Sequence, residues 1–173
     1  MPELIFRNAT LDDLPAIVAI YNSTIESRLV TADTEMVSVE SRLPWFAEHE
    51  PATRPLWVVQ YPSQQEVAGW VSFQDFYGRP AYAATAEISI YLHPQYRGQG
   101  LGKQVLEYSI QACPSLGIKN LLAYIFAHNE PSLKLFQQAG FAEWAYLPCI
   151  AELDGVERSL KILGKRVQPV ALP

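Results

Sequence analysis

At residues 97–103 the chain carries the run Arg97-Gly98-Gln99-Gly100-Leu101-Gly102-Lys103. A strand of alternating polarity, Ala86–Leu92, precedes this run, and a helix is predicted over Gln104–Ala112. Glycines in such a turn allow the backbone to approach a phosphate closely. The helix that follows offers unpaired N–H groups and the positive end of its dipole. The run therefore predicts an anion site between a strand and a helix.

The same run fits neither of two common phosphate-binding motifs. A P-loop ending at Gly102-Lys103 needs glycine at position 97 and serine or threonine at 104, where the chain has Arg97 and Gln104. A dinucleotide fingerprint G-x-G-x-x-G needs glycine at 103 or 105, where Lys103 and Val105 stand. What remains is Arg-x-x-Gly-x-Gly at a strand-to-helix junction.

Outward from this turn, hydrophobic periodicity predicts interleaved strands and helices. Strands are predicted at Leu4–Arg7, Leu56–Tyr61, Val67–Phe73, Ala86–Leu92, Leu121–Phe126, Phe141–Ile150 and Glu157–Leu163. Helices are predicted at Leu11–Tyr21, Val37–Glu48, Gln104–Ala112 and Glu130–Ala139. Thr10 with Asp13 predicts a helix start, and Gly140 a helix end. This order indicates an α+β (α/β) domain with a mixed sheet.

Length and composition exclude several classes of protein. The 173 residues suit one domain, expected over residues 1–166, with a loose tail at 167–173. The chain is 49% hydrophobic and 18% charged, which excludes a disordered protein. A net charge of −5 argues against binding nucleic acid or an anionic membrane. No apolar run approaches the ~20 residues of a membrane span, and the N-terminus lacks a signal-peptide pattern, so a cytoplasmic protein is expected.

Cysteine and histidine give no sign of a disulfide framework or a metal site. Two cysteines are too few for such a framework, and Cys149, in an apolar run, is expected to be a buried thiol. The three histidines, His49, His93 and His128, are too far apart to have a metal-ligand spacing. Four tryptophans are expected in the core rather than in a site: Trp45, Trp57, Trp70 and Trp144.

The turn at 97–103 resembles the acetyl-CoA-binding turn of the GNAT acetyltransferase superfamily. A second segment, residues 128–141 (HNEPSLKLFQQAGF), is similar to the superfamily's Asn-x-x-(small)-x-x-x-(aromatic)-x-x-x-Gly-Phe pattern. Further segments resemble the branch that acetylates phosphinothricin and methionine sulfoximine: Ile20–Glu26, Thr31–Glu35, Phe76–Tyr82, Thr85–Glu87 and Gly155–Leu163. The resemblance implies the GNAT acyl-CoA N-acyltransferase fold, with a central mixed β-sheet flanked by helices. It also implies acetyl-CoA as acetyl donor, no metal, a small-molecule amine as acceptor, and a homodimer.

The resemblance also implies a cofactor site. Backbone N–H groups of the turn would hold the CoA pyrophosphate, with Asn129 and Ser132 beside the pantetheine arm. The central strand of the superfamily splays near its end and frees backbone amides for the oxyanion, here at residues 90–92. The residues expected at the cofactor are Ile90, Tyr91, Leu92, Arg97, Gly98, Gln99, Gly100, Leu101, Gly102, Lys103, Asn129 and Ser132.

Acetyl transfer to an ammonium needs a base, and Glu87 is the candidate. In the resembled branch a glutamate at this place acts as base through a water. Partial burial would raise the pKa of Glu87 and suit it to that role. Where the superfamily has a tyrosine or histidine as acid, this chain has Phe136, which cannot donate a proton. Tyr124 is a weaker candidate for the acid, and a thiol can also leave as thiolate with little help.

Substrate residues are expected just before Glu87. An amino-acid carboxylate calls for arginine and hydroxyl donors, and Arg79, Tyr82 and Thr85 resemble the substrate loop of the branch. Glu26 is a candidate for orienting the amine, although Glu26 and Arg79 also fit solvated surface charges. Two other functions stay open: an acetyltransferase of protein N-termini or another amine, and a non-catalytic acyl-CoA-binding module. Arg79 and Glu87 favour the small amino-acid-like acceptors methionine sulfoximine, methionine sulfone and phosphinothricin.

Overall fold

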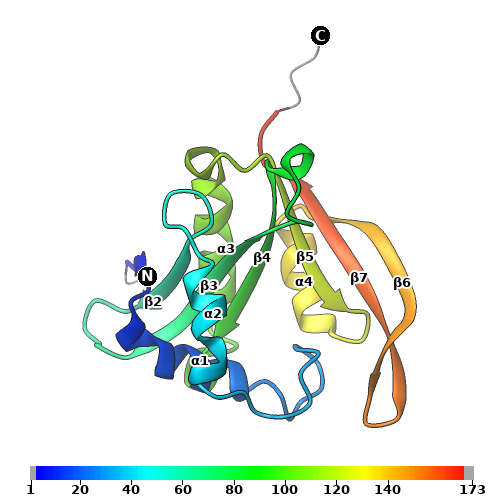
Figure 1. Ribbon diagram of the computed structural model, residues 1–173, viewed down its shortest axis with the longest axis horizontal. Helices are drawn as coiled ribbons and strands as arrows, with labels where there is room; N and C mark the ends of the chain where they lie inside the picture. Colours follow the sequence, from blue (N-terminus) through cyan, green and yellow to red (C-terminus); the bar gives the residue numbers. More distant parts are fainter. Residues whose placement is uncertain (1–2, 170–173) are drawn as a thin grey trace.

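The computed structural model describes residues 3–169, which form one seven-stranded sheet with helices on both faces (Figure 1). The strands are β1 (Ile5–Asn8), β2 (Leu56–Gln60), β3 (Val67–Asp75), β4 (Thr85–Leu92), β5 (Asn120–Phe126), β6 (Ala142–Leu153) and β7 (Val156–Arg166). The α-helices are α1 (Leu14–Asn22), α2 (Leu43–Ala47), α3 (Leu101–Ala112) and α4 (Glu130–Gln138). The strand order is β1-β2-β3-β4-β5-β7-β6, which confirms the mixed sheet.

The parallel pair β4 and β5 lies at the centre of the sheet, and every other neighbouring pair is antiparallel. The β4–β5 ladder consists of three residue pairs, Thr85↔Asn120, Ala86↔Leu121 and Glu87↔Leu122. Beyond Glu87 each strand continues along its other neighbour, and the two diverge (Figure 1). The sheet therefore opens at its centre into a V-shaped gap between β4 and β5.

Alternating side chains of the strands build a separate core on each face of the sheet. On one face, α1 packs on Leu56, Val58 and Trp70. On the other face, α3 and α4 pack on Val71, Ile88 and the other strand residues whose side chains point to that face. Polar side chains on the α1 face of β3 and β4 therefore need partners or a cavity, because they point toward α1 and α2 rather than into solvent.

Several expected helix boundaries hold, and one helix is shorter than predicted. The Thr10 N–H donates to Asp13 Oδ2 at 2.8 Å, and Gly140 follows α4 with φ +89°. The helix predicted over 37–48 is instead a 3-10 turn, η2 (Glu40–Arg42), followed by five residues of α2. Pro44 explains the break, because it lacks the N–H that would continue a helix from residue 40.

Two residues that were expected to be buried, Cys149 and Trp144, are exposed. Cys113 is buried, and burial raises the pKa of its thiol to about 12, but Cys149 is exposed. Cys149 lies where the β6–β7 register shifts, with φ +49°, so the irregular strand turns it outward. Trp144 is also exposed on edge strand β6. The tail is tied at its start, because Val167 N–H donates to Lys119 O, while residues 170–173 lie outside the described part of the chain.

Candidate active site

The gap between β4 and β5 is a cavity that passes through the sheet. Consecutive residues of β4 and of β5 line it, so its wall includes side chains from both faces of the sheet. The lining residues are Val30, Ile88, Ser89, Ile90, Tyr91, Ala123, Tyr124, Ile125, Asn129, Ser132 and Phe136. His93 N–H donates to Ala68 O, and Thr85 O accepts from Phe76 N–H, so odd-numbered amides of β4 face β3. Because amides alternate along a strand, those of Ile90 and Leu92 face the gap. The Tyr91 amide is directed to β3 instead, which differs from the expectation.

The glycine-rich turn lies at the wide end of this gap and opens α3. Gly98 and Gly100 adopt left-handed backbone conformations, with φ +72° and +80°, which only glycine takes up without strain. Within residues 3–169, the amides of Gly98 through Lys103 have no hydrogen-bond partner. A Cβ at Gly100 would meet nothing within 4 Å, so the space above the turn is open. The turn thus presents a row of free N–H groups at a helix N-terminus, as an anion requires.

The side chains of the turn have different roles from its backbone. Arg97 Nε donates to Leu92 O at 3.0 Å, and its Nη2 donates to Ser23 Oγ at 2.7 Å. Arg97 therefore joins the turn to β4 and to the end of α1. The Leu101 side chain is buried in the core, and Lys103 is exposed beside Glu107. Among these residues, Lys103 has the side chain free to reach a phosphate.

Asn129 serves α4 and the cavity at once. It is 5% exposed, and its Oδ1 accepts from Ser132 N–H at 3.3 Å, which caps α4. Its Nδ2 has no partner in the described chain, and the residue lines the cavity with Ser132. An amide donor is therefore held at the gap in a fixed orientation.

Glu87 occupies the last residue pair before the strands diverge. It pairs across the sheet with Gln74, so its side chain lies on the α1 face with Ser89 and Tyr91. Burial raises the pKa of the Glu87 carboxyl. Its charge in turn contributes to the raised pKa values of the Tyr91 and Tyr124 phenols, although burial is the larger cause for both. The arrangement places a basic carboxylate next to two protonated phenols.

The proton donor expected from the superfamily is missing, and Tyr124 lies near its place. Phe136 is 6% exposed and lines the gap from α4, where it supplies an apolar wall. Tyr124 lines the same gap from β5, and its raised pKa keeps the phenol protonated at neutral pH. The side chain lies on the Glu87 face, because its neighbours Ala123 and Ile125 belong to the opposite core.

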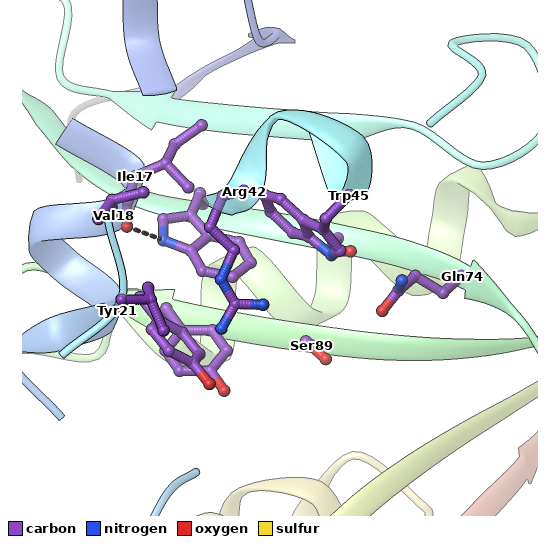
Figure 2. Close-up of a pocket in the computed structure, with 11 residues that line it drawn as sticks. Ile17, Val18, Tyr21, Arg42, Trp45, Gln74 and Ser89 are labelled. Atoms are coloured by element: carbon purple, nitrogen blue, oxygen red, sulfur yellow. Dashed lines mark hydrogen bonds between the residues drawn. The ribbon is translucent and has the colours of Figure 1, made fainter. Parts of the chain in front are cut away.

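A second cavity, of about 330 Å³, lies between α1, α2 and the same face of β3 and β4 (Figure 2). Its walls are mostly aromatic and aliphatic, and the strands add the polar side chains of Ser72, Gln74 and Ser89. The residues that line it are Ile17, Val18, Tyr21, Val37, Arg42, Trp45, Trp70, Ser72, Gln74, Ser89 and Tyr91. Ser89 and Tyr91 also line the gap between β4 and β5. The two cavities therefore meet at these residues, two to four positions beyond Glu87.

Hydrogen bonds and ring contacts fix this second cavity. Trp70 Nε1–H donates to Ile17 O at 3.1 Å, and its ring stacks on Tyr91 with centroids 4.5 Å apart. Burial lowers the pKa of His49, whose neutral ring donates from Nδ1 to Trp45 O at 2.9 Å. Nε2 must then accept, so Ser72 Oγ donates to it at 2.8 Å and turns its lone pairs toward the cavity. Trp45 and Trp70 are thus cavity walls as well as core.

The residues predicted to bind substrate lie elsewhere. Arg79 and Tyr82 are exposed and line a cleft at the other end of β4, beside Glu48 and Glu50. Thr85 Oγ1 accepts from Asn120 Nδ2 at 3.2 Å, and Glu26 is exposed beyond α1. None of these four lines either cavity. Arg79, Tyr82 and Thr85 lie before or at the start of β4, whereas the two cavities meet farther along this strand, at Ser89 and Tyr91.

The sequence contained a signal for residues that were missed. Ser72, Gln74 and Ser89 are polar residues in otherwise apolar strands, and their side chains lie on the same face of the sheet as Glu87. Together they mark a polar stripe on that face. Arg42 gave no such signal, since it depends on how η2 and α2 fold back over the sheet. Within residues 3–169, no group of three or more potential metal-binding side chains occurs, and no helix has the length and apolarity to cross a membrane.

Comparisons with known proteins agree with this geometry. Residues 17–141 match the sequence profile described as "Acetyltransferase (GNAT) family". YwnH of Bacillus subtilis (strain 168), whose name assigns it provisionally as a phosphinothricin acetyltransferase, is 53% identical over 161 residues, covering 93% of this chain and 98% of YwnH. The L-methionine sulfoximine/L-methionine sulfone acetyltransferase of Pseudomonas paraeruginosa (strain DSM 24068 / PA7) is 28% identical, covering 94% of each chain. The yncA structure from Salmonella typhimurium, solved with its cofactor acetyl-CoA, superimposes with a TM-score of 0.87 at 26% identity, covering 98% and 97% of the two chains.

Proposed function

The chain belongs to the GNAT family of acetyltransferases, and on that premise we propose that it transfers acetyl from acetyl-CoA to the amino group of a small amino-acid-like substrate. Methionine sulfoximine, methionine sulfone and phosphinothricin are the proposed acceptors, because relatives carry these names. One observation carries the proposal: the gap between β4 and β5 and the neighbouring cavity of about 330 Å³ share Ser89 and Tyr91 in their walls, so a thioester in the one could meet a small amine in the other.

Acetyl-CoA would lie with its pyrophosphate on the free amides of residues 98–103 and its pantetheine arm in the gap. Asn129 Nδ2 and the Ser132 side chain face that arm. The Ile90 and Leu92 amides are the gap-facing donors of β4. The acetyl group then reaches the junction of the two cavities, where the amine meets it.

In the proposed reaction, Glu87 accepts a proton from the substrate ammonium through a water. The freed nitrogen attacks the thioester carbonyl carbon, and the resulting oxyanion accepts a hydrogen bond from the Ile90 amide. The nitrogen then gives up its second proton to solvent, the C–S bond breaks to form the amide, and the sulfur leaves as thiolate. Tyr124 is the side chain positioned to return a proton to the sulfur, since Phe136 has none to give.

A homodimer in the cytoplasm is part of the same proposal, and it rests on the resemblance to the branch. The nearest alternative acceptor is the N-terminus of a protein. The second cavity favours a small molecule by its size, because about 330 Å³ holds one amino-acid-sized ligand and not a length of peptide chain.

We test the function by incubating the protein with acetyl-CoA and a panel of amines while measuring free thiol. We expect turnover with methionine sulfone, methionine sulfoximine or phosphinothricin, and weak or no turnover with peptides that present the same N-terminal residue. Thiol release that requires peptides would move the protein to the alternative acceptor class. Acetyl-CoA binding without turnover of any amine would identify a non-catalytic module.

The turn provides a second test, through the substitution Gly100→Val. We expect CoA affinity to fall by at least about tenfold, because a branched side chain at φ +80° strains the turn and fills the space above the amides. Gly117→Val is the matched control, since Gly117 has φ +70° and equally open surroundings away from the gap. Calorimetric titration of both variants decides the matter. A folded Gly100→Val protein that binds CoA like the wild type contradicts the assignment.

A further inference from the structure

We propose that Arg42 binds the carboxylate of the amine substrate and thereby selects free amino acids. This inference rests on the proposed function, for which it names the group that recognises the acceptor. Arg42 is the one charged side chain among the residues that line the second cavity. A cationic group in an otherwise aromatic and neutral cavity indicates an anionic group on the ligand.

The guanidinium of Arg42 is held in place from two sides. It lies over the Tyr21 ring, 4.7 Å from the centroid, and its Nη2 donates to Asp33 Oδ2 at 2.7 Å. The Tyr21 hydroxyl also donates to Asp33 and makes a 2.5 Å hydrogen bond with Thr31 Oγ1. This network orients the guanidinium before any ligand arrives, which reduces the entropy lost on binding.

Donors remain on Arg42 after these contacts. A guanidinium has five N–H groups, and the bond to Asp33 uses one of them. Within residues 3–169, Nε and Nη1 have no hydrogen-bond partner. Figure 2 shows the guanidinium extending from η2 into the cavity, toward the side where Tyr21 and Ser89 lie. Its free edge can therefore donate to a ligand carboxylate.

The position of Arg42 suits an α-amino acid. Arg42 shares the second cavity with Tyr91, a residue that also lines the gap, so the cation lies in the cavity that meets the gap. In an α-amino acid one carbon separates the carboxylate from the amine. A carboxylate on Arg42 thus directs the amine toward the junction at Ser89, and Glu87 lies two residues before Ser89 on the same face of β4. The side chain would occupy the aromatic part formed by Trp45 and Trp70.

Arg79 is the competing assignment, and its surroundings disfavour it. It lies in a different cleft, where Arg54 is paired with Asp75 and the further carboxylates Glu48 and Glu50 repel an anionic ligand. The two arginines can therefore be compared directly, each as the glutamine variant.

The experiment measures kcat/KM for methionine sulfone and for its carboxamide, which keeps the amine and side chain but lacks the charge. We expect the wild type to prefer the acid, and Arg42→Gln to lose about ten- to a hundredfold in kcat/KM for the acid, mainly through KM, with little change for the amide. Arg42→Lys restores part of the preference, because lysine keeps the charge without the planar donor edge. Arg79→Gln keeps the acid-to-amide ratio.

Each other outcome overturns a named statement. A wild type that acetylates acid and amide equally well rejects carboxylate recognition, whatever the variants do, and leaves the proposed function intact. A ratio that collapses in Arg79→Gln and not in Arg42→Gln assigns the carboxylate to Arg79. A wild type that acetylates none of methionine sulfone, its carboxamide, methionine sulfoximine and phosphinothricin rejects both the function and this inference. Circular dichroism of Arg42→Gln separates lost binding from lost folding, and the wild-type ratio does not depend on that variant.

Discussion

Glu87→Gln is expected to lower kcat by roughly 10²- to 10⁴-fold, the usual range for loss of a general base. Glutamine keeps the shape and the cross-strand position opposite Gln74, but it cannot accept the proton of the substrate ammonium. Affinity for acetyl-CoA should change little, because the turn at 97–103 is separate from this carboxylate. Steady-state kinetics with calorimetric titration of CoA measures both quantities. Glu152→Gln, on exposed β6, is the matched control and should retain wild-type turnover.

The role of Glu87 as base also predicts how kcat/KM depends on pH. Burial raises the pKa of Glu87, so the carboxylate forms at a higher pH than an exposed glutamate would need. In the wild type, kcat/KM should rise as the pH passes through the raised pKa of Glu87, and it should fall at lower pH, where the carboxyl is protonated. The substrate ammonium adds its own rising limb at alkaline pH, and that limb should persist in Glu87→Gln. Near wild-type turnover of the variant at neutral pH would show that another group activates the amine.

Phe73→Ala should have the largest effect on stability, a loss of roughly 3–5 kcal/mol in the free energy of unfolding. The Phe73 side chain is fully buried on the α3 face of β3, and its ring meets Trp57 edge to face with centroids 5.2 Å apart. Truncation removes these contacts and leaves a cavity in the main core. Urea unfolding without CoA, with a lower midpoint and an unchanged slope, is the expected result.

Phe76→Ala is the control for this prediction. Phe76 is only half-buried, in the loop after β3, where it contacts Tyr77 and Tyr82. Its truncation should cost less than about 1 kcal/mol, as surface substitutions do. Equal losses in the two variants would mean that the face of β3 toward α3 is not the main core.

Local sequence predicted the parts of the molecule that local interactions determine. The turn at 97–103 and the cap at Gly140 depend on glycine conformation, which the residue type alone reveals. Alternation identified β4 and placed Glu87 at its start, two residues from where the cavities meet. The separation of β4 from β5 came from the resemblance, since no residue type in either strand marks it.

The second cavity, in which we propose that the substrate binds, was not predicted, because tertiary packing creates it. Arg42 and Trp45 belong to a short irregular segment, and only its fold over β3 brings them to Ser89. The resemblance to the branch, and proximity to Glu87 in sequence, pointed to Arg79 instead, which lines a different cleft before the start of β4. Cys149 was misjudged for a related reason: apolar neighbours suggested burial, but edge strand β6 leaves them exposed.

The three-pair ladder between β4 and β5 has a consequence for the lifetime of the protein. Its two half-sheets share few backbone hydrogen bonds, and a cofactor in the gap touches both. At a concentration a hundred times its dissociation constant, such a ligand adds about 2.7 kcal/mol to the free energy of unfolding. If acetyl-CoA binds in the gap as proposed, protein without it would be the form that opens and meets proteases. The abundance of the enzyme would thereby follow the supply of its own acetyl donor.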